Sequence, residues 1–140
     1  MNYGEVLALF FIELRSLYKK KIDLKGASFQ QMIAIVAIPL GSIEMSALSE
    51  KLGIDNSTAT RLINGLVTKK WVSRHQYEDD KRIIKVGLTK KGKVVQAVFE
   101  QQFDKIGQII EKNIDPIDKQ KMIEVISKLK WIMLKMNNIK

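Results

Sequence analysis

The sequence predicts a mainly α-helical fold with one small β-hairpin, and three observations lead to this prediction. Apolar residues recur at helical spacing over most of the 140 residues. The period shortens to that of a strand only between residues 72 and 88, on either side of the polar stretch 77–81. A chain of this length suits one ordinary domain and is too short for two large ones. We therefore expect a single domain over residues 1–140.

Two helices are expected in the N-terminal part of the chain. An apolar stripe that begins at Val6 predicts the first helix, which the basic run 19–21 ends. Ser28 is placed to cap a short second helix, and Pro39 ends it.

A compact pair of helices follows, with a glycine between them. Ser46 can cap the short first helix, which Gly53 ends. Asp55 or Asn56 can cap a longer helix that runs to about residue 70. This arrangement can place the second helix in the major groove of DNA. Together with the hairpin it predicts a winged helix-turn-helix from about Ser46 to Gly92, within a DNA-binding part that we place at residues 28–92.

The C-terminal part is expected to be two helices. Thr89 can cap the first, and Asp115-Pro116 is a helix-start signal because proline is favoured at the first helical position. The apolar stripes at both ends of the chain are wider than one chain of this size would bury. We therefore expect residues 1–25 and 93–140 to dimerise with a second copy about a twofold axis. The alternative is that these stripes only wrap the central core.

The charge of the chain favours an acidic partner. The net charge is +9, and residues 54–93 hold ten Lys or Arg against four Asp or Glu. Such a balance suits nucleic acid or an anionic membrane surface, although a basic surface can also serve solubility alone.

Several classes of function are disfavoured by what the sequence lacks. The absence of cysteine excludes disulfides, thiolate zinc sites and thiol redox sensing, and a lone histidine, His75, makes a histidine metal site or a catalytic triad hard to build. We expect no catalytic residue, no metal and no cofactor. The apolar run 6–12 lies between Glu5 and Glu13 and does not resemble a signal peptide, and no apolar run is long enough to span a membrane. A cytoplasmic protein is expected.

One face of the second helix of the pair carries side chains that suit base edges. Arginine can donate two hydrogen bonds to guanine, asparagine can pair with adenine, and serine or threonine can contact either bases or phosphates. The helix N-terminus adds N–H groups that favour phosphate. The residues of this face are Ser57, Thr58, Thr60, Arg61 and Asn64. The alternative is a merely solvated helix face.

The hairpin tip mixes three acids with two bases. We expect Asp80 to fold back on Arg74 or Arg82 and to stiffen the loop, so that Arg82 is ready to enter a narrow minor groove. The predicted DNA-binding residues are Ser57, Thr58, Thr60, Arg61, Asn64, Lys69, Arg74, Lys81, Arg82 and Lys91, and Asp80 supports the wing.

Two stretches resemble the MarR/SlyA family of winged helix-turn-helix transcriptional regulators. Residues 60–72 (TRLINGLVTKKWV) resemble the family's recognition helix. The spacing of Arg74, Asp80-Lys81-Arg82 and Leu88-Thr89-x-x-Gly92, with five residues in each gap, resembles its wing and the exit from the wing. The resemblance implies a homodimer, held by the terminal helices, with two winged domains on a pseudo-palindromic site. It also implies that Arg82 is the minor-groove arginine. Finally, it implies a pocket between the dimerisation helices and the winged domain that binds a small aromatic or phenolic effector.

The sequence departs from the family pattern at a few positions. Asn64-Gly65 stands where an Asp-Arg pair is frequent, Lys70 where a glycine usually ends the recognition helix, and Ser73 where glutamate is common. Glycine inside a helix costs about 1 kcal/mol relative to alanine, so we expect close packing at Gly65.

These observations predict a sequence-specific, DNA-binding transcriptional regulator that binds double-stranded DNA as a homodimer on a pseudo-palindromic operator. We expect a repressor that responds to a small molecule. The alternatives are a winged helix that docks proteins and a sequence-independent, nucleoid-type DNA binder. An enzyme is disfavoured.

Overall fold

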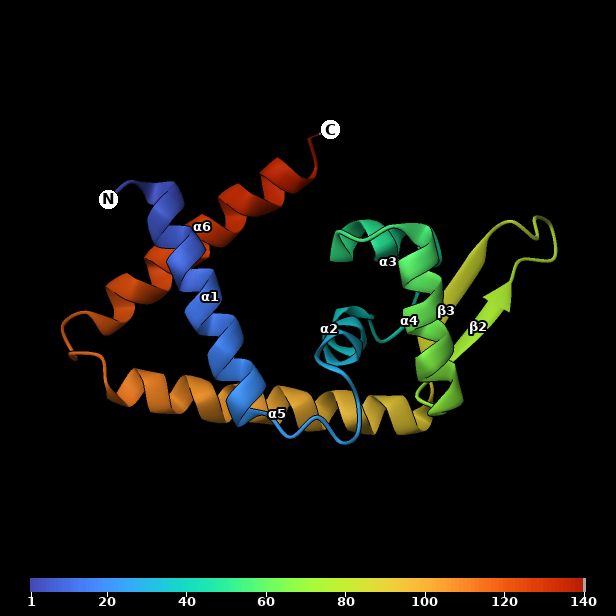
Figure 1. Ribbon diagram of the computed structural model, residues 1–140, viewed down its shortest axis with the longest axis horizontal. Coiled ribbons are helices and arrows are strands. Elements are labelled where there is room, and N and C mark those ends of the chain that lie inside the picture. Colours follow the sequence, from blue (N-terminus) through green and yellow to red (C-terminus); the bar gives the residue numbers. More distant parts are fainter. Residues whose placement is uncertain (140) are drawn as a thin grey trace. The chain divides into compact units, whose positions relative to one another are not determined.

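The computed structural model describes residues 1–139; Lys140, on which the predicted domain and dimerisation part end, lies outside the described residues. The described part is mostly helical with a small sheet, which confirms the predicted fold class (Figure 1). Its elements are α1 (Tyr3–Lys21), α2 (Phe29–Ala37), β1 (Ser42–Glu44), α3 (Met45–Leu52), α4 (Asn56–Thr68), β2 (Val72–Gln76), β3 (Ile84–Leu88), α5 (Lys90–Lys112) and α6 (Lys119–Asn137). The chain divides into two compact units, Met1–Phe103 and Asp104–Lys140, and each is described by itself.

The first two helices begin at capping boxes. Asn2 accepts a hydrogen bond from the backbone of Glu5, and the Glu5 side chain bonds back to the backbone of Asn2. Ser28 and Gln31 do the same at the start of α2, which confirms the predicted cap at Ser28.

The helix pair is present, but its first helix starts earlier than predicted. The short strand β1 pairs with β3 and keeps the backbone extended through Glu44, and α3 then begins at Met45. The predicted cap at Ser46 is therefore wrong, because Ser46 already lies inside the helix. Gly53 ends α3 in the left-handed region at φ +68°, as expected of the glycine in the turn.

The second helix of the pair begins where the sequence predicts. The Asp55 carboxylate accepts a hydrogen bond of 2.7 Å from the backbone N–H of Thr58, so Asp55 is the cap rather than Asn56. The helix α4 ends at Thr68, two residues before the predicted end, and Lys70 follows with a positive φ of 65°.

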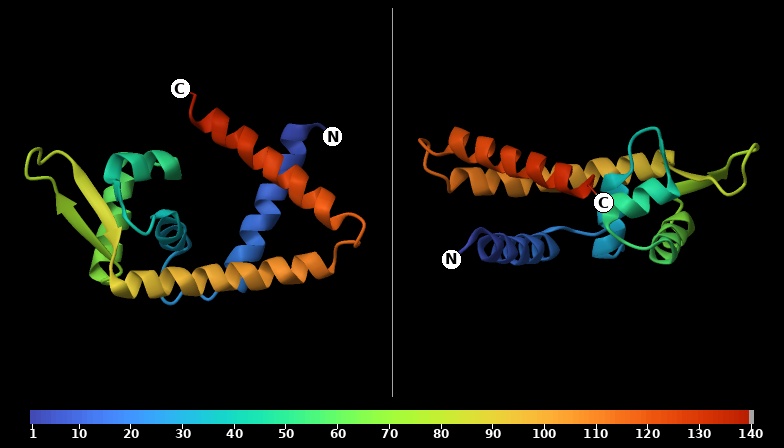
Figure 2. Two further views of the ribbon diagram at one scale, coloured as in Figure 1. Left: turned by 180° about the vertical axis from the view of Figure 1, so that it is seen from behind. Right: turned by 90° about the horizontal axis from the view of Figure 1, so that it is seen from above.

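The strands form one antiparallel sheet in the order β1-β3-β2. The predicted hairpin is confirmed, although its second strand begins at Ile84, after the basic pair at its tip. Strand β1 was not predicted, because three residues are too few to show a period of two. Figure 2 shows the hairpin projecting beyond α3 and α4 within the first unit.

The first unit has its own apolar core. In and beside the helix pair, Leu48, Ile63 and Leu66 are fully buried, whereas Leu52, Ile54, Leu62 and Val67 are half-buried. Trp71 is buried at the junction of α4 and β2 and meets the ring of Phe99 edge to face at 6.5 Å. Met32, Ile35 and Val86 are also fully buried.

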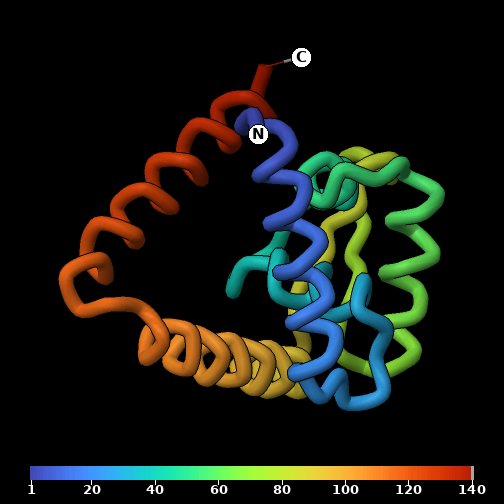
Figure 3. Tube along the Cα trace, turned by 60° about the vertical axis from the view of Figure 1, so that its left-hand side comes forward, coloured from blue at the N-terminus to red at the C-terminus, as the bar shows by residue number. Residues whose placement is uncertain are grey.

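The last helix begins later than the proline signal predicts. Residues 115–118 form a turn in which the N–H of Asp118 donates to the carbonyl of Asp115, and α6 begins at Lys119. The prediction of Pro116 at the first helical position is therefore wrong. Before this turn, α5 is one uninterrupted coil (Figure 3). Among residues 1–139, no helix is both long and apolar enough to cross a membrane.

Candidate nucleic-acid interface

The helix α4 separates a buried apolar face from an exposed polar one. Ala59, Ile63 and Leu66 are fully buried on one side. On the other side Ser57, Thr60, Arg61 and Asn64 are exposed and Thr58 is half-buried. Residues 57, 61 and 64 are three or four positions apart and so share one face of the helix. This face offers a guanidinium, an amide and hydroxyls to a ligand.

The first turn of α4 is organised by Asp55. Its carboxylate accepts from the backbone of Thr58 at 2.7 Å and from the Ser57 hydroxyl at 3.3 Å. The backbone hydrogen bond from Thr58 is the main reason that the pKa of Asp55 is lowered from its ordinary value. Arg61 reaches back along the helix to the Thr58 hydroxyl at 3.4 Å. The polar side chains of this turn are therefore linked before any ligand arrives.

At the wing, Asp80 pairs with Arg82 and not with Arg74. Both carboxylate oxygens accept from the guanidinium at 3.1 Å, and one of them also accepts from the backbone N–H of Arg82 at 3.0 Å. These bonds lower the pKa of Asp80, with the side-chain contact to Arg82 as the largest cause. The Arg82 side chain nevertheless remains 91% exposed. An ion pair this exposed adds little stability, so what it provides is a restricted position for Arg82.

Arg74 instead contacts α4. Val72 and Arg74 lie two residues apart in β2 and so point to the same face of the sheet, the face that packs against α4. The Arg74 guanidinium donates to the side-chain oxygen of Asn64. Ser73 and His75 point to the opposite face, where their side chains lie 3.2 Å apart.

The remaining predicted lysines are in different surroundings. The Lys69 ammonium donates to the carbonyl of Gly26 at 2.9 Å and lies 5.2 Å from the Trp71 ring centroid, so it is held by its own chain. Lys81, at the wing tip, and Lys91, in the first turn of α5, are exposed.

The base of the wing is held in place by Thr89, which the sequence predicts only as a helix cap. Thr89 donates from its hydroxyl to the carbonyl of Lys70 at 2.6 Å, and it accepts from the N–H of Gly92 at 3.0 Å. Its own N–H donates to the carbonyl of Trp71 at 3.0 Å. Thr89 is therefore the predicted cap of α5 and also joins α5 to the end of α4.

Two glutamines of α5 hold the first unit together and were missed from the sequence. The Gln96 amide donates to the carbonyls of Ile35 and Ile38, each at 2.8 Å, and Gln102 exchanges two hydrogen bonds with the backbone of Asp23. Only their place on the apolar side of α5 could have indicated that Gln96 is buried and Gln102 half-buried.

A pocket of about 480 Å³ lies within the first unit, beside the start of α4. Its lining is mostly apolar, with one cation, Arg15, whose guanidinium stands 5.6 Å from the Phe29 ring centroid. The lining residues are Phe11, Leu14, Arg15, Tyr18, Phe29, Gln30, Ile33, Leu52, Ile54, Thr58 and Leu62. An apolar molecule with one negative charge fits this chemistry. Within the described residues, no cluster of His, Cys, Asp or Glu is arranged to hold a metal ion.

Known proteins resemble this chain in sequence and in structure. The model of the MarR family matches residues 40–84, which span β1, the helix pair, β2 and the loop of the hairpin and end at the first residue of β3. The chain is 30% identical over 122 residues to the HTH-type transcriptional regulator SarZ of Staphylococcus epidermidis, a match that covers 83% of this chain and 80% of SarZ. It is also 30% identical over 81 residues to the transcriptional repressor MprA of Escherichia coli, across 58% of this chain and 46% of MprA.

Solved structures share the fold. The reduced form of MarR from Escherichia coli superposes with a TM-score of 0.80 at 22% identity, over 92% of this chain and 96% of that one. Streptococcus pneumoniae FabT, solved in complex with DNA, gives a TM-score of 0.76 at 21% identity, over 96% and 99% of the two chains. At these identities the similarity is one of fold.

Proposed function

This chain belongs to the MarR family of DNA-binding transcriptional regulators, and from that premise we propose that it binds a pseudo-palindromic operator as a homodimer in the bacterial cytoplasm. The observation that carries the proposal is the exposed polar face of α4, together with a wing arginine, Arg82, whose position is restrained by Asp80. The face would enter the major groove, and Arg82 the adjacent minor groove. The chain would act by binding and not by catalysis.

The DNA complexes of two structural neighbours support this assignment. FabT and Staphylococcus aureus MepR have both been solved with DNA, and the fold of this chain matches theirs with TM-scores of 0.76 and 0.72. The positive charge concentrated between residues 54 and 93 is also what a phosphate backbone requires.

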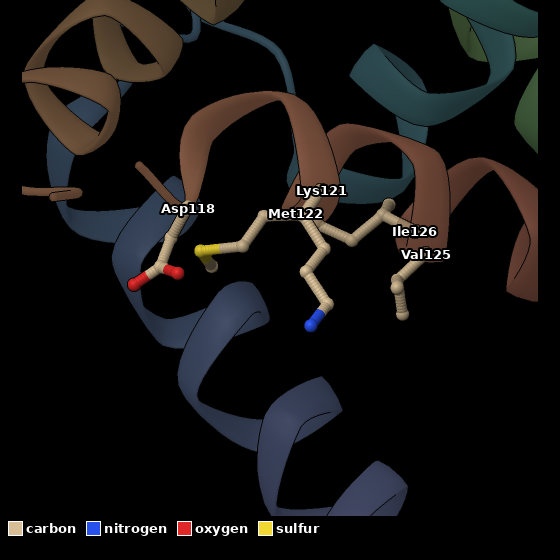
Figure 4. Close-up of a pocket in the computed structure, with 5 residues that line it drawn as sticks. All are labelled: Asp118, Lys121, Met122, Val125 and Ile126. Atoms are coloured by element: carbon tan, nitrogen blue, oxygen red, sulfur yellow. The ribbon is translucent and has the colours of Figure 1, made fainter. Parts of the chain in front are cut away.

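The proposed homodimer is supported by the apolar surface of the terminal helices. Helix α1 exposes Leu9, Phe10 and Phe11 by half or more. Figure 4 shows Met122, Val125 and Ile126 projecting to one side of α6, where they border a hollow with Asp118 and Lys121. Exposed apolar side chains in such numbers favour burial against another protein surface, and a second copy of this chain would bury both sets.

Regulation by a small molecule is supported by the pocket in the first unit. Thr58 lines the pocket and also belongs to the polar face of α4, so an occupant would act directly on the helix that meets DNA. We infer an aromatic or phenolic anion, with its charge at Arg15. A repressor is the direction favoured by MprA, a relative that is named as one.

DNase I footprinting on the DNA upstream of this gene tests the function. We expect protection of an inverted repeat whose half-sites lie about one helical turn apart. If a dimer neutralises about 6–10 phosphates, its affinity should fall steeply with salt. Equal affinity for operator and random duplexes would favour a nucleoid-type binder. A flat dependence on salt without protection would favour a protein-docking module.

Sedimentation tests the assembly separately. Val125→Glu and Ile126→Glu together should convert a dimer into a monomer and weaken operator binding. A wild-type chain that sediments as a monomer at micromolar concentration would contradict the dimer.

A further inference from the structure

The contact between Asn64 and Arg74 assigns a role to each residue within the proposed DNA interface. We propose that Asn64 is a positioning residue: its neutral amide holds the Arg74 guanidinium beside α4, with the positive charge left free for a DNA phosphate. This inference rests on the proposed function, since it requires DNA to lie against the exposed face of α4.

The geometry fixes which way the amide faces. The guanidinium nitrogens are all donors, so the amide can meet Arg74 only through its oxygen. Reading adenine requires that same oxygen to accept from the base while the amide nitrogen donates. Because the oxygen is engaged by Arg74, the position of Asn64 favours support of Arg74 over recognition of adenine.

The positive charge of Arg74 is not neutralised by its partner, because the Asn64 amide is uncharged. Neither the ion pair of Asp23 with Lys25 nor that of Asp80 with Arg82 includes Arg74. Asp80, which the sequence predicts as a partner of either Arg74 or Arg82, gives both of its oxygens to Arg82. A guanidinium has five N–H groups, so a single amide contact leaves donors for the paired hydrogen bonds that arginine makes with phosphate.

The position of Arg74 also suits a phosphate contact. It is an exposed residue of β2 that contacts α4, between the proposed base-reading side chains and the tip of the wing. A cation fixed there can meet the backbone that separates a major groove from the neighbouring minor groove. Such a contact contributes affinity and orientation but carries no sequence information.

Replacing the amide by an acid of the same shape tests this role. Asn64→Asp would turn the contact into an ion pair and withdraw the Arg74 charge from DNA. We expect affinity for both operator and random duplexes to fall about tenfold, measured by fluorescence anisotropy over a range of salt. The salt slope should fall by about one for each phosphate that the protein no longer neutralises. Arg74→Gln should give the same result.

The double variant separates this mechanism from simple repulsion. In the Arg74→Gln background, Asn64→Asp should have little further effect, because the charge that it neutralises is already absent. Gln101→Glu makes the same amide-to-acid change on an exposed position of α5 and should leave binding unchanged. Thermal melting of each variant checks that the fold is retained.

Two outcomes would overturn the inference. If Asn64→Asp lowers only operator affinity with an unchanged salt slope, Asn64 reads a base. If it weakens binding equally with and without Arg74, the new acid repels phosphate directly. Titration of the wild-type protein tests the proposed function by itself. If the wild-type protein binds operator and random duplexes equally well, the proposed function is refuted. If it prefers the operator but the effects of substitutions at residues 64 and 74 are simply additive, only the positioning role of Asn64 is refuted.

Discussion

A Cβ atom on Gly92 would lie 1.9 Å from the carbonyl oxygen of Trp71. The same carbonyl accepts the N–H of Thr89, so the first turn of α5 lies directly on the backbone that leads into the wing. The clash would be with backbone and not with a movable side chain. Glycine is therefore required at the end of the Leu88-Thr89-x-x-Gly92 pattern by contact alone.

Gly92→Ala should lower the free energy of unfolding by about 3 kcal/mol, the upper part of the range for overpacking, because α5 must move away from Trp71. Urea denaturation at one protein concentration measures this. Gly107→Ala in the same helix is the matched control, since nothing lies within 4 Å of its Cβ. It should raise stability by about 0.5–1 kcal/mol. Equal stability of the two variants would show that the close approach is absent.

The caps at Ser28, Asp55 and Thr89 could be predicted from sequence, because each depends on a hydrogen bond only three residues away. Ser46 and Pro116 obey the same local rules, yet pairing of β1 with β3 and a turn at 115–118 decide where those helices start. Local preference therefore fails where tertiary contacts or a competing turn fix the backbone.

The candidate site also has a part that could be predicted from local sequence and a part that depends on tertiary packing. The polar face of α4 could be predicted because helical spacing alone places its residues together. The contact of Arg74 with Asn64, and the bond of Lys69 to Gly26, join residues 10 and 43 positions apart and depend on how elements pack. At Gly65 a Cβ would lie 2.6 Å from the Gln31 amide, which agrees with the close packing expected there.

Lys70→Gly should stabilise the protein, although it removes a side chain. Lys70 adopts a φ of +65°, and the left-handed region costs a non-glycine residue about 1–2 kcal/mol. Glycine avoids that strain but gains freedom in the unfolded chain, so we expect a net gain of about 0.5–1 kcal/mol in urea denaturation. Lys70→Ala removes the same charge and retains the strain. The expectation fails if alanine stabilises as much as glycine.

The Asp80 carboxyl should titrate below its ordinary pKa of 3.8, because Arg82 donates to its charged form. A lowered pKa means that the ion pair is complete above the ordinary value and breaks only as pH falls through the lowered one. The wing should therefore not respond to Asp80 near neutral pH. Carbon-13 NMR of the carboxyl measures the midpoint, and Arg82→Gln should raise it. An unchanged midpoint in that variant would place the cause elsewhere.

Arg15 should anchor the charge of an effector in the pocket beside α4. A hydrogen bond between charged groups contributes about 1.5–3 kcal/mol, so Arg15→Gln should weaken binding of hydroxybenzoate by about tenfold or more. Isothermal titration calorimetry measures this, with hydroxybenzamide as the neutral probe. Lys20→Gln, on the same helix but outside the pocket lining, is the control. Equal losses for acid and amide would mean that Arg15 shapes the pocket without pairing with the charge.

Arg61 and Lys91 should affect DNA binding in different ways. Arg61 lies on the exposed face of α4, where a guanidinium can donate two hydrogen bonds to guanine. Arg61→Ala should therefore reduce the difference in binding free energy between operator and random duplexes by about 1–3 kcal/mol. Lys91 is an exposed cation in the first turn of α5, and Lys91→Ala should weaken both duplexes about equally while the salt slope falls by about one. Anisotropy titrations with the two duplexes at several salt concentrations separate the effects. The reverse pattern would move base reading from α4 to the start of α5, because a side chain that contacts only phosphate weakens binding to both duplexes about equally.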